Sequence, residues 1–473
     1  MNFFEKIRKA VRHLFGTSYV SKAFGIQIAV SPKMQTAVQT WTEMYEDRPP
    51  WKALEKGKLT LNLPAAISSE IARLVTIEMK SVVSGSPRAD YINEQYQRVV
   101  DKARDFTEKA CALGGICLKP YVVQQTGQVA VSIVQAADFY PVAWNSDGDV
   151  TAAVFVDTTY INDKKYTRLE YHKLEGNQYT ITNKAYRLNT ASVSQEQKKS
   201  ALGNEVLLSE VPEWASIEPV VTISDIERPL FSYFKMPFAN SVDTASFLGV
   251  SCFSRAVDQI HKADDLWSEM AWEYESGERC VNAPEDFFRT GEDGKPIIPE
   301  GRERLYRTFS WDNGKALDTY SPDFRDQSLF NGLNKVLHKV EFLCGVATGT
   351  FSEPVETDKT ATEVKQSKQR SFSTVSDVQK ALQKALEGIV YCIDVMATLY
   401  ELAPEGEYEI SYDWDDSIIV DREVEFARLM SMAAAGMIRP EYVTAWYYGV
   451  SLDDARAMMP EAEPDNPPPE EEE

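Results

Sequence analysis

The sequence predicts an α+β fold in which a mostly helical N-terminal stretch leads into an antiparallel sheet and two later helices bracket an insertion. Three observations support this expectation. Apolar residues recur at helical spacing from residue 32 to about 113, and short β-rich runs follow between 116 and 182. Helical patterns then return at 254–274 and 328–343, and a much longer one runs from 359 to 402. With 473 residues, 43% of them hydrophobic, the chain is long enough for about two to four domains.

The first of these regions predicts three helices. One stripe ends at Pro49-Pro50, a second surrounds Ile67 and Ile71, and a third helix is expected from near Asp90 to Leu113, where Gly114-Gly115 stops it. Strands are expected at 117–123, 129–134, 168–172 and 179–182. An amphipathic helix over 2–15 has two open interpretations, a membrane-surface helix and, favoured here, a helix docked on its own domain or on a neighbouring subunit.

The insertion between the two later helices, from Gly277 to Asp326, is rich in glycine, proline and aromatic residues. We expect a small β-containing excursion there, reached by a helical stalk. The run from Gly345 to Pro354 has no periodicity and is predicted to be a loop. After it, Thr360 and Glu363 fit a capping box at the start of a helix roughly 60 Å long at 1.5 Å per residue.

That long helix has an uneven apolar density. Between Val364 and Phe372 all seven residues are polar, whereas from Leu382 onward the apolar residues have the spacing of a core helix. Between Lys359 and Lys384 there are six basic residues and two acidic ones, so the segment is net +4. The plainer interpretation of this charge is that the segment has a solvated face or makes salt bridges to an adjacent chain. The alternative is a face that meets phosphate transiently.

The composition excludes several classes of function. The net charge is −22, and seven uncompensated acids in the tail 461–473 leave −15 for the rest, so simple electrostatic attraction to nucleic acid is not expected. The tail itself, rich in proline and glutamate, is expected to be disordered.

The six cysteines are scattered, with no C-x-x-C pair and no signal peptide, which indicates reduced thiols in a cytoplasm. The four histidines are also dispersed, so we expect no zinc site and ordinary surface or partly buried roles. No apolar run reaches the length of a membrane span.

The sequence lacks the common catalytic motifs. The string at Gly291 to Ile297 lacks the spacing and hydroxyl of a nucleotide-binding loop, and neither a G-x-S-x-G elbow nor a dinucleotide loop occurs. The acids Asp413, Asp415 and Asp416 could supply paired carboxylates, which keeps a monomeric acidic hydrolase as an alternative function. From the rest of the sequence we expect no enzyme activity, catalytic residue, cofactor or metal.

Several short motifs, spread over most of the chain, occur in the same order as in a known protein family. The motifs are Trp41-Thr-Glu-Met-Tyr45 with Pro50-Trp51, Ile67-Ser-Ser-Glu-Ile-Ala-Arg-Leu-Val75, Ala137-Asp-Phe-Tyr-Pro141, Pro229-Leu-Phe-Ser-Tyr-Phe-Lys-Met-Pro237 with Asn240, Leu248-Gly-Val-Ser-Cys-Phe253 and Lys359-Thr-Ala-Thr-Glu-Val364. The sequence resembles the portal (head-to-tail connector) proteins of tailed bacteriophages, particularly siphophages of Gram-positive hosts. A non-portal adaptor of a phage particle is a third possibility, but adaptors are usually shorter and lack a stalk with an inserted head.

The resemblance implies a portal-like fold with named parts. These would be an α+β wing at 1–245, stem helices at 246–276 and 327–344, a clip at 277–326, a tunnel loop at 345–358, the long helix and a return to the wing at 359–420, a helical crown at 421–460 and the acidic tail at 461–473.

The resemblance also implies the function. The chain would form a ring, typically of twelve subunits, at one capsid vertex of the virion, through which double-stranded DNA is packaged and ejected. It would be assembled in the host cytoplasm and would not contact a membrane. Its partners would be its own copies, the terminase large subunit, head-completion (adaptor) proteins, the major capsid and scaffolding proteins, and the passing DNA. Candidate channel residues are Thr350, Lys359, Lys365 and Lys368, and candidate docking residues of the clip are Phe287, Phe288, Arg289 and Lys295.

Overall fold

The computed structural model describes residues 19–54, 57–123, 126–189, 201–277, 280–284, 291, 297, 306–309, 318–320, 323–353, 361–414 and 422–459. Of residues 280–284, 306–309, 318–320, 361–368 and 422–425 it describes the backbone. The chain divides into two units, Met1–Tyr412 and Asp413–Glu473, and each is described by itself. The expected N-terminal helix over 2–15, the capping box at Thr360 and the acidic tail lie outside the described residues.

The first unit begins with helices, as the periodicity predicts. They are α2 (Pro32–Tyr45), α3 (Leu63–Thr76), α4 (Pro87–Val100) and α5 (Ala103–Leu113). Ser31 caps α2 by accepting a hydrogen bond from the Met34 amide at 3.3 Å. The single helix expected from Asp90 to Leu113 was wrong, because the chain turns at residues 101–102 and makes two helices. An unexpected strand, β1 (Met79–Ser84), precedes α4, and its partner β14 (Glu409–Trp414) is more than 300 residues away in the sequence.

Two sheets follow, and in both the pairings are antiparallel, as expected. The smaller has the order β10-β2-β3 and the larger the order β4-β5-β6-β7-β8, with β9 on β7. Their bounds are β2 (Gly115–Val123), β3 (Gln128–Gln135), β4 (Phe139–Trp144), β5 (Val150–Ile161), β6 (Lys164–Glu175), β7 (Gln178–Asn189), β8 (Asn204–Val206), β9 (Val220–Ile223) and β10 (Ser232–Lys235). A core that includes Cys117, Phe139, Phe155 and Phe231 forms between them.

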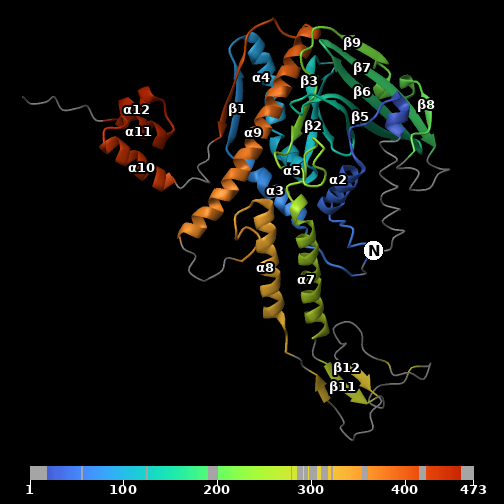
Figure 1. The fold of residues 1–473 in the computed structure, drawn as a ribbon, viewed down its shortest axis with the longest axis vertical. Coiled ribbons are helices and arrows are strands. Elements are labelled where there is room, and N and C mark those ends of the chain that lie inside the picture. Colours follow the sequence, from blue (N-terminus) through green and yellow to red (C-terminus); the bar gives the residue numbers. More distant parts are fainter. Residues whose placement is uncertain are drawn as a thin grey trace, which may run out of the picture. The chain divides into compact units, whose positions relative to one another are not determined.

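The long helix α9 (Ala361–Leu399) packs against β2, β10, α3 and α4 (Figure 1). Its second half is buried, as its apolar spacing predicts. The buried apolar residues are Val375, Val378, Leu382, Ala385, Leu386, Ile389, Val390, Cys392, Ile393 and Ala397. Arg88 of α4, which is 1% exposed, fixes the far end by donating to Asp394 Oδ1 at 2.7 Å and to the Ala403 carbonyl at 2.8 Å. The first half packs more lightly, with Gln369 and Arg370 exposed, although Ser371 and Gln379 are buried polar residues.

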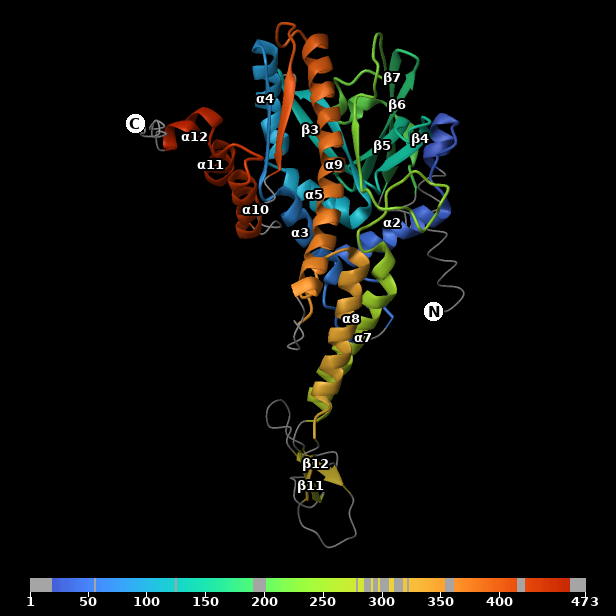
Figure 2. The ribbon, with the colours of Figure 1, turned by 60° about the vertical axis from the view of Figure 1, so that its left-hand side comes forward.

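Two helices lie side by side and lead to a small β-rich segment (Figure 2). They are α7 (Val257–Ser276), preceded by the short turn η4 (Ser254–Ala256), and α8 (Asp326–Cys344), so the helices expected at 254–274 and 328–343 are confirmed. Between them, β11 (Cys280–Pro284) pairs in parallel with β12 (Tyr306–Phe309) and antiparallel with β13 (Asp318–Tyr320). The prediction of a β-containing excursion is therefore confirmed.

The second unit contains α10 (Arg422–Ala434), α11 (Pro440–Tyr448) and α12 (Leu452–Met458). Ser451 caps α12 by accepting a hydrogen bond from the Asp454 amide at 3.2 Å. Contacts between neighbouring helices hold the unit together, including Phe426 against Tyr447 with ring centroids 4.7 Å apart. Across the described parts of both units, no helix combines the length and the apolar character that crossing a bilayer requires.

Candidate functional site

The candidate site is the pair α7 and α8 together with the loop of residues 345–353 that follows α8. The two helices bury small and branched apolar residues along the faces that they turn to each other and to the body of the unit. These residues are Ile260, Ala263 and Met270 of α7 and Leu333, Val340 and Cys344 of α8. Polar residues, by contrast, fix the two ends of the pair.

At the end next to the β11–β13 segment, Glu273 binds Arg325. The Arg325 amide, Nε and Nη2 donate to the Glu273 carboxylate at 3.0, 3.1 and 2.6 Å. These bonds from Arg325 lower the pKa of Glu273 below its ordinary value. Phe324 packs beside Tyr274 with ring centroids 5.4 Å apart. It also lies so close to Gly277 that a Cβ there would be 2.4 Å from the ring. The C-terminus of α7 and the N-terminus of α8 are therefore clamped together.

At the opposite end, Asp264 anchors α7 to the segment before α3. Its carboxylate is 2% exposed and accepts hydrogen bonds from Trp51 Nε1 at 2.8 Å and from the Leu61 amide at 2.9 Å. Burial raises the pKa of Asp264 although both bonds act to lower it. The neighbouring Asp265 binds Lys58 from the same segment. These contacts hold the start of the helix pair against the N-terminal helices.

The third contact is Glu341 of α8, a fully buried carboxylate that organises the following loop. It accepts hydrogen bonds from the amides of Gly349 at 3.2 Å, Phe351 at 2.7 Å and Ser352 at 2.9 Å, and from the Ser352 hydroxyl at 2.8 Å. Several backbone amides converging on one charged group make strong, short-range restraints. The loop is thus folded back on the helix that precedes it.

Two neighbours complete this arrangement. His338 Nδ1 lies 2.9 Å from Ser352 Oγ, and because that hydroxyl gives its proton to Glu341, the imidazole Nδ1–H is the donor. Gly345, with φ of +72°, ends α8 in the left-handed region, and a Cβ there would meet Thr374 Oγ1 of α9 at 2.4 Å. The turn therefore needs glycine both for its conformation and for the close approach of α9.

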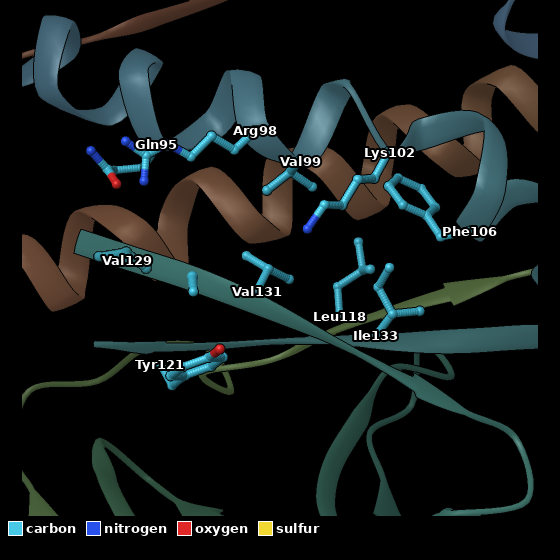
Figure 3. A pocket seen from close by; sticks show the side chains of 11 residues that line it. Gln95, Arg98, Val99, Lys102, Phe106, Leu118, Tyr121, Val129, Val131 and Ile133 are labelled. Atoms are coloured by element: carbon cyan, nitrogen blue, oxygen red, sulfur yellow. The ribbon is translucent and has the colours of Figure 1, made fainter. Parts of the chain in front are cut away.

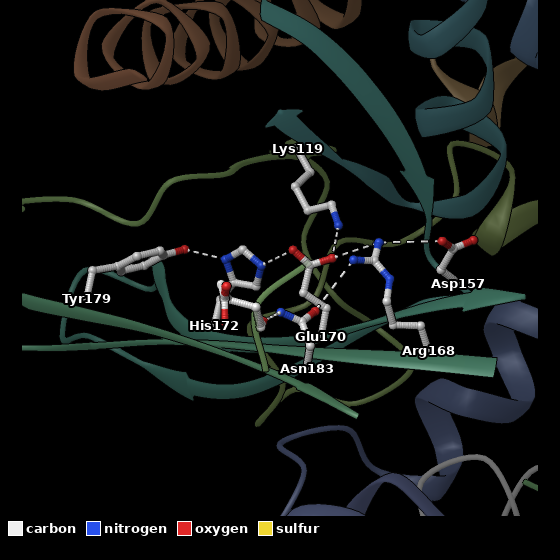
Figure 4. Close-up of polar contacts among 8 residues, drawn as sticks. Lys119, Asp157, Arg168, Glu170, His172, Tyr179 and Asn183 are labelled. Carbon is white, nitrogen blue, oxygen red and sulfur yellow. Dashed lines mark hydrogen bonds and ion pairs between the residues drawn. The ribbon is translucent and has the colours of Figure 1, made fainter. Parts of the chain in front are cut away.

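A separate buried network links the two sheets (Figure 4). Glu170 of β6 binds Lys119 of β2, lies 3.3 Å from Arg168 Nη2 and accepts a hydrogen bond from His172 Nε2 at 2.8 Å. Tyr179 OH lies 2.7 Å from His172 Nδ1, so the neutral imidazole accepts from the phenol and donates to the carboxylate. Burial acts to raise the pKa of Glu170, but Lys119, His172 and Arg168 together lower it well below its usual range, and burial lowers the pKa of His172. The expectation that the histidines are ordinary surface or partly buried residues was wrong for His172, which is 3% exposed.

The smaller of two cavities is a poor candidate for a cofactor site. It has a volume of about 130 Å³ and lies between α4–α5 and β2–β3, lined by apolar side chains such as Val99 and Leu118, with Arg98 and Lys102 also on its wall (Figure 3). This is below the usual volume of a small-molecule pocket, roughly 300 Å³ or more. A wider groove of about 880 Å³ runs between residues 145–151, 227–239 and α9, and side chains of both charges line it, with Lys384 and Asp149 paired at 2.7 Å.

The comparison that decides the family is with models of protein families. The model described as phage portal protein, SPP1 Gp6-like, matches residues 46–465. The chain belongs to this phage portal family. The resemblance seen in the motif order is thereby confirmed, and with it the function of a portal protein, the ring-forming component at a capsid vertex. The family is a structural one, and nothing supports the hydrolase alternative. The expected type of phage and host stays a prediction.

Solved structures of gene transfer agent particles are also similar to this chain, at low sequence identity. A virion of a native gene transfer agent particle is 11% identical, with a TM-score of 0.42 over 88% of this chain and 93% of that one. The neck of a native particle, computed with C12 symmetry, is 10% identical, with a TM-score of 0.44 over 92% and 99%. The neck of an empty particle, computed with C6 symmetry, is 11% identical, with a TM-score of 0.41 over 83% and 91%. No curated protein matches significantly.

Only part of the predicted portal site can be located. Thr350 is exposed on the loop that Glu341 organises, and its hydroxyl donates to the Ala347 carbonyl at 2.6 Å. Lys365 and Lys368 are on the first turns of α9, where only the backbone is described, and Lys359 lies outside the described residues. Phe287, Phe288, Arg289 and Lys295 also lie outside them.

The remaining expectations concern acids and thiols. Asp413 is exposed on β14, and Asp415 and Asp416 fall outside the described residues. In the parts of the chain that the structure describes, no group of three or more histidine, cysteine or acidic side chains could hold a metal ion. Cys111, Cys117, Cys252, Cys344 and Cys392 are free and buried, and the side chain of Cys280 is not described. The functional residues that sequence reasoning missed are Glu273, Arg325, Glu341 and Ser352.

Proposed function

We propose that twelve copies of this chain form a ring whose channel passes double-stranded DNA during packaging and ejection. The observation that carries the proposal is the helix pair α7–α8, clamped by Glu273 at one end and followed by a loop held by Glu341 at the other. A channel wall has to keep its geometry while a long polymer slides past. Clamped helices and a loop restrained by several amides on one carboxylate suit that task.

Each segment then takes a role in the ring. Residues 1–245 form the wing, 246–276 and 327–344 the stem, 277–326 the clip, 345–358 the tunnel loop, 359–420 the long helix and its return to the wing, and 421–460 the crown. The clip, with Phe287, Phe288, Arg289 and Lys295 as contact candidates, docks the terminase large subunit and later the head-completion proteins. The wing contacts the major capsid and scaffolding proteins, and assembly takes place in the host cytoplasm.

The charge of the chain supports a DNA channel without strong binding. Duplex DNA carries about one negative charge per 1.7 Å of its axis, so a strongly basic wall would hold many phosphates and resist sliding. A ring of subunits that each carry a net charge of −22 repels the duplex from its wall. A few cations at defined heights, with Lys359, Lys365 and Lys368 as candidates, would then centre or slow the DNA without trapping it, and Thr350 of the loop is a further channel candidate.

The mass of the purified assembly tests the ring. Native mass spectrometry of the full chain should show one dominant species of about twelve subunits. A monomer or an open-ended series of masses would overturn the proposal, because a heterologous interface that closes gives one fixed number of copies. A closed ring with a different number of subunits would overturn only the number twelve and not the ring itself.

A further inference from the structure

The outer faces of the helix pair differ in charge. On α7, the side opposite the buried residues Ile260, Ala263 and Met270 carries a stripe at helical spacing. The stripe consists of Asp258, Lys262, Asp265, Glu269 and Trp272. Lys262, its only cation, lies 3.9 Å from Asp265, which also binds Lys58 of the same chain, so Asp258 and Glu269 supply the net negative charge of the stripe. Asp258 and Glu269 are exposed, and Trp272 is 62% exposed. This side of the pair is therefore acidic with one large aromatic ring on it.

On α8, the side opposite Leu333 and Val340 carries the complementary stripe. It consists of Asn331, Lys335, Lys339 and Phe342, all exposed and again at helical spacing. No ion pair joins Lys335 or Lys339 to another residue within the described ranges. Phe342 is 50% exposed and contacts two cations, with Arg370 of α9 4.2 Å and Lys339 4.8 Å from its ring centre. This side of the pair is basic with one aromatic ring.

We infer that the occupant of each stripe is a second copy of this chain, with the α7 stripe of one copy facing the α8 stripe of the next. This inference rests on the proposed ring. A head-to-tail interface needs two different, mutually complementary surfaces on one subunit, and a ring closes when they are placed on opposite sides. The two stripes meet this requirement, because each lies opposite the buried residues of its own helix and the two differ in charge. Repeated around the ring, opposite charges fix the register and like charges disfavour other pairings.

Charge reversal on either stripe tests the inference. In Lys335→Glu/Lys339→Glu, both stripes are acidic, and in Asp258→Lys/Glu269→Lys, both are basic. We expect each variant to lose rings, with a ring fraction at least about tenfold below that of the parent at equal concentration by native mass spectrometry. Lys80→Glu/Lys102→Glu changes the net charge by the same amount as the first variant, at two exposed lysines of β1 and the α4–α5 turn, and should assemble as the parent does.

Restoring complementarity provides the decisive result. The two reversed variants, mixed, should form rings again in which they alternate, because each then offers the other an opposite stripe. A single chain with all four substitutions should also assemble alone. Circular dichroism and thermal unfolding of the separate variants check that each is folded, and the fourfold variant shows whether the substitutions themselves are tolerated.

The outcomes separate this inference from the ring itself. If the parent is monomeric, the proposed ring and the inference both fail. If the parent and both reversed variants form rings equally well, only the inference fails. If Lys335→Glu/Lys339→Glu assembles normally but its particles lose DNA, the α8 stripe faces the channel, and the assignment to a second copy is overturned. If neither the mixture nor the fourfold variant restores rings while both single-stripe variants are folded monomers, charge complementarity between the stripes is likewise overturned.

Discussion

The Ser352 hydroxyl donates a hydrogen bond to the Glu341 carboxylate at 2.8 Å. Glu341 belongs to α8, and Ser352 belongs to the loop that directly follows this helix. The same carboxylate accepts from three amides of that loop and is fully buried. The conformation of residues 345–353 is therefore set by α8. For a portal protein, this means that the start of the proposed tunnel loop is a rigid extension of the helix pair.

Replacing Glu341 should release the loop. Glu341→Gln removes the charge and turns one accepting oxygen into an NH2 donor, which faces amide and hydroxyl donors that it cannot satisfy. We expect a loss of about 1–3 kcal/mol in the free energy of unfolding, measured by urea denaturation at fixed protein concentration. Hydrogen exchange at the amides of Gly349, Phe351 and Ser352 should accelerate.

The matched control is Glu353→Gln, because Glu353 is exposed and its hydrogen bonds to Asn334 are made by its backbone carbonyl and amide. It should change the free energy of unfolding by less than about 0.5 kcal/mol. If Glu341→Gln exchanges at these three amides as slowly as the parent, the carboxylate does not hold the loop.

The buried network between the sheets should be much more costly to break. Glu170→Gln leaves Lys119 and Arg168 without their shared carboxylate, and uncompensated buried charge destabilises by about 3–5 kcal/mol. Equilibrium unfolding in urea measures this loss. Glu175→Gln, an exposed acid on the same strand, is the control and should have little effect. Equal stabilities of the two variants would show that the network is not a stabilising link.

The same network predicts a pH dependence. The pKa of His172 is lowered from its ordinary 6.5, so the unfolded chain takes up a proton there before the folded chain does. Its contribution is full above about pH 6.5 and is lost as the pH falls below that value. The pKa of Glu170 is also lowered, so its contribution begins to be lost only below about pH 4.5. Between pH 7 and 5, His172→Gln should show a smaller loss of stability than the parent, as measured by the urea midpoint. Parallel curves would contradict this assignment.

The basic segment at the start of α9 leads to a prediction about DNA. Particles with Lys359→Ala, Lys365→Ala and Lys368→Ala together should differ from wild type in the amount of DNA packaged or retained, because cations at defined heights interact with passing phosphates. Lys380→Ala/Lys384→Ala, two exposed lysines further along the same helix, serves as the control. If the triple variant packages and retains DNA as the wild type does, these lysines do not interact with the passing DNA.

The periodic elements of this fold can be predicted from the sequence. The apolar stripes of α7, α8 and α9 repeat every three or four residues, and helices that bury one face have to show this pattern. What the pattern cannot show is β1, because its partner β14 is far away and supplies the backbone hydrogen bonds that stabilise it. The break between α4 and α5 is missed for a similar reason, since neither glycine nor proline marks the turn at residues 101–102.

The polar contacts of the site are harder to predict from the sequence than the helices are. Glu341 follows Val340 on the buried side of α8, and a carboxylate there reads as an interruption of the apolar face. A glutamate in that position just before a loop rich in glycine, serine and threonine is a usable signal, because such loops expose amides that need an acceptor. Glu273 and Arg325 are separated by the whole β11–β13 segment, so no local pattern could pair them.

The most direct test of this account is a reconstruction of the purified full-length assembly by electron cryomicroscopy, at a resolution that separates helices. We expect a closed ring in which copies of α7 and α8 surround a central hole and residues 345–353 lie next to that hole. A monomer, or a ring whose hole is bounded by other elements with α7 and α8 on its outside, would contradict it.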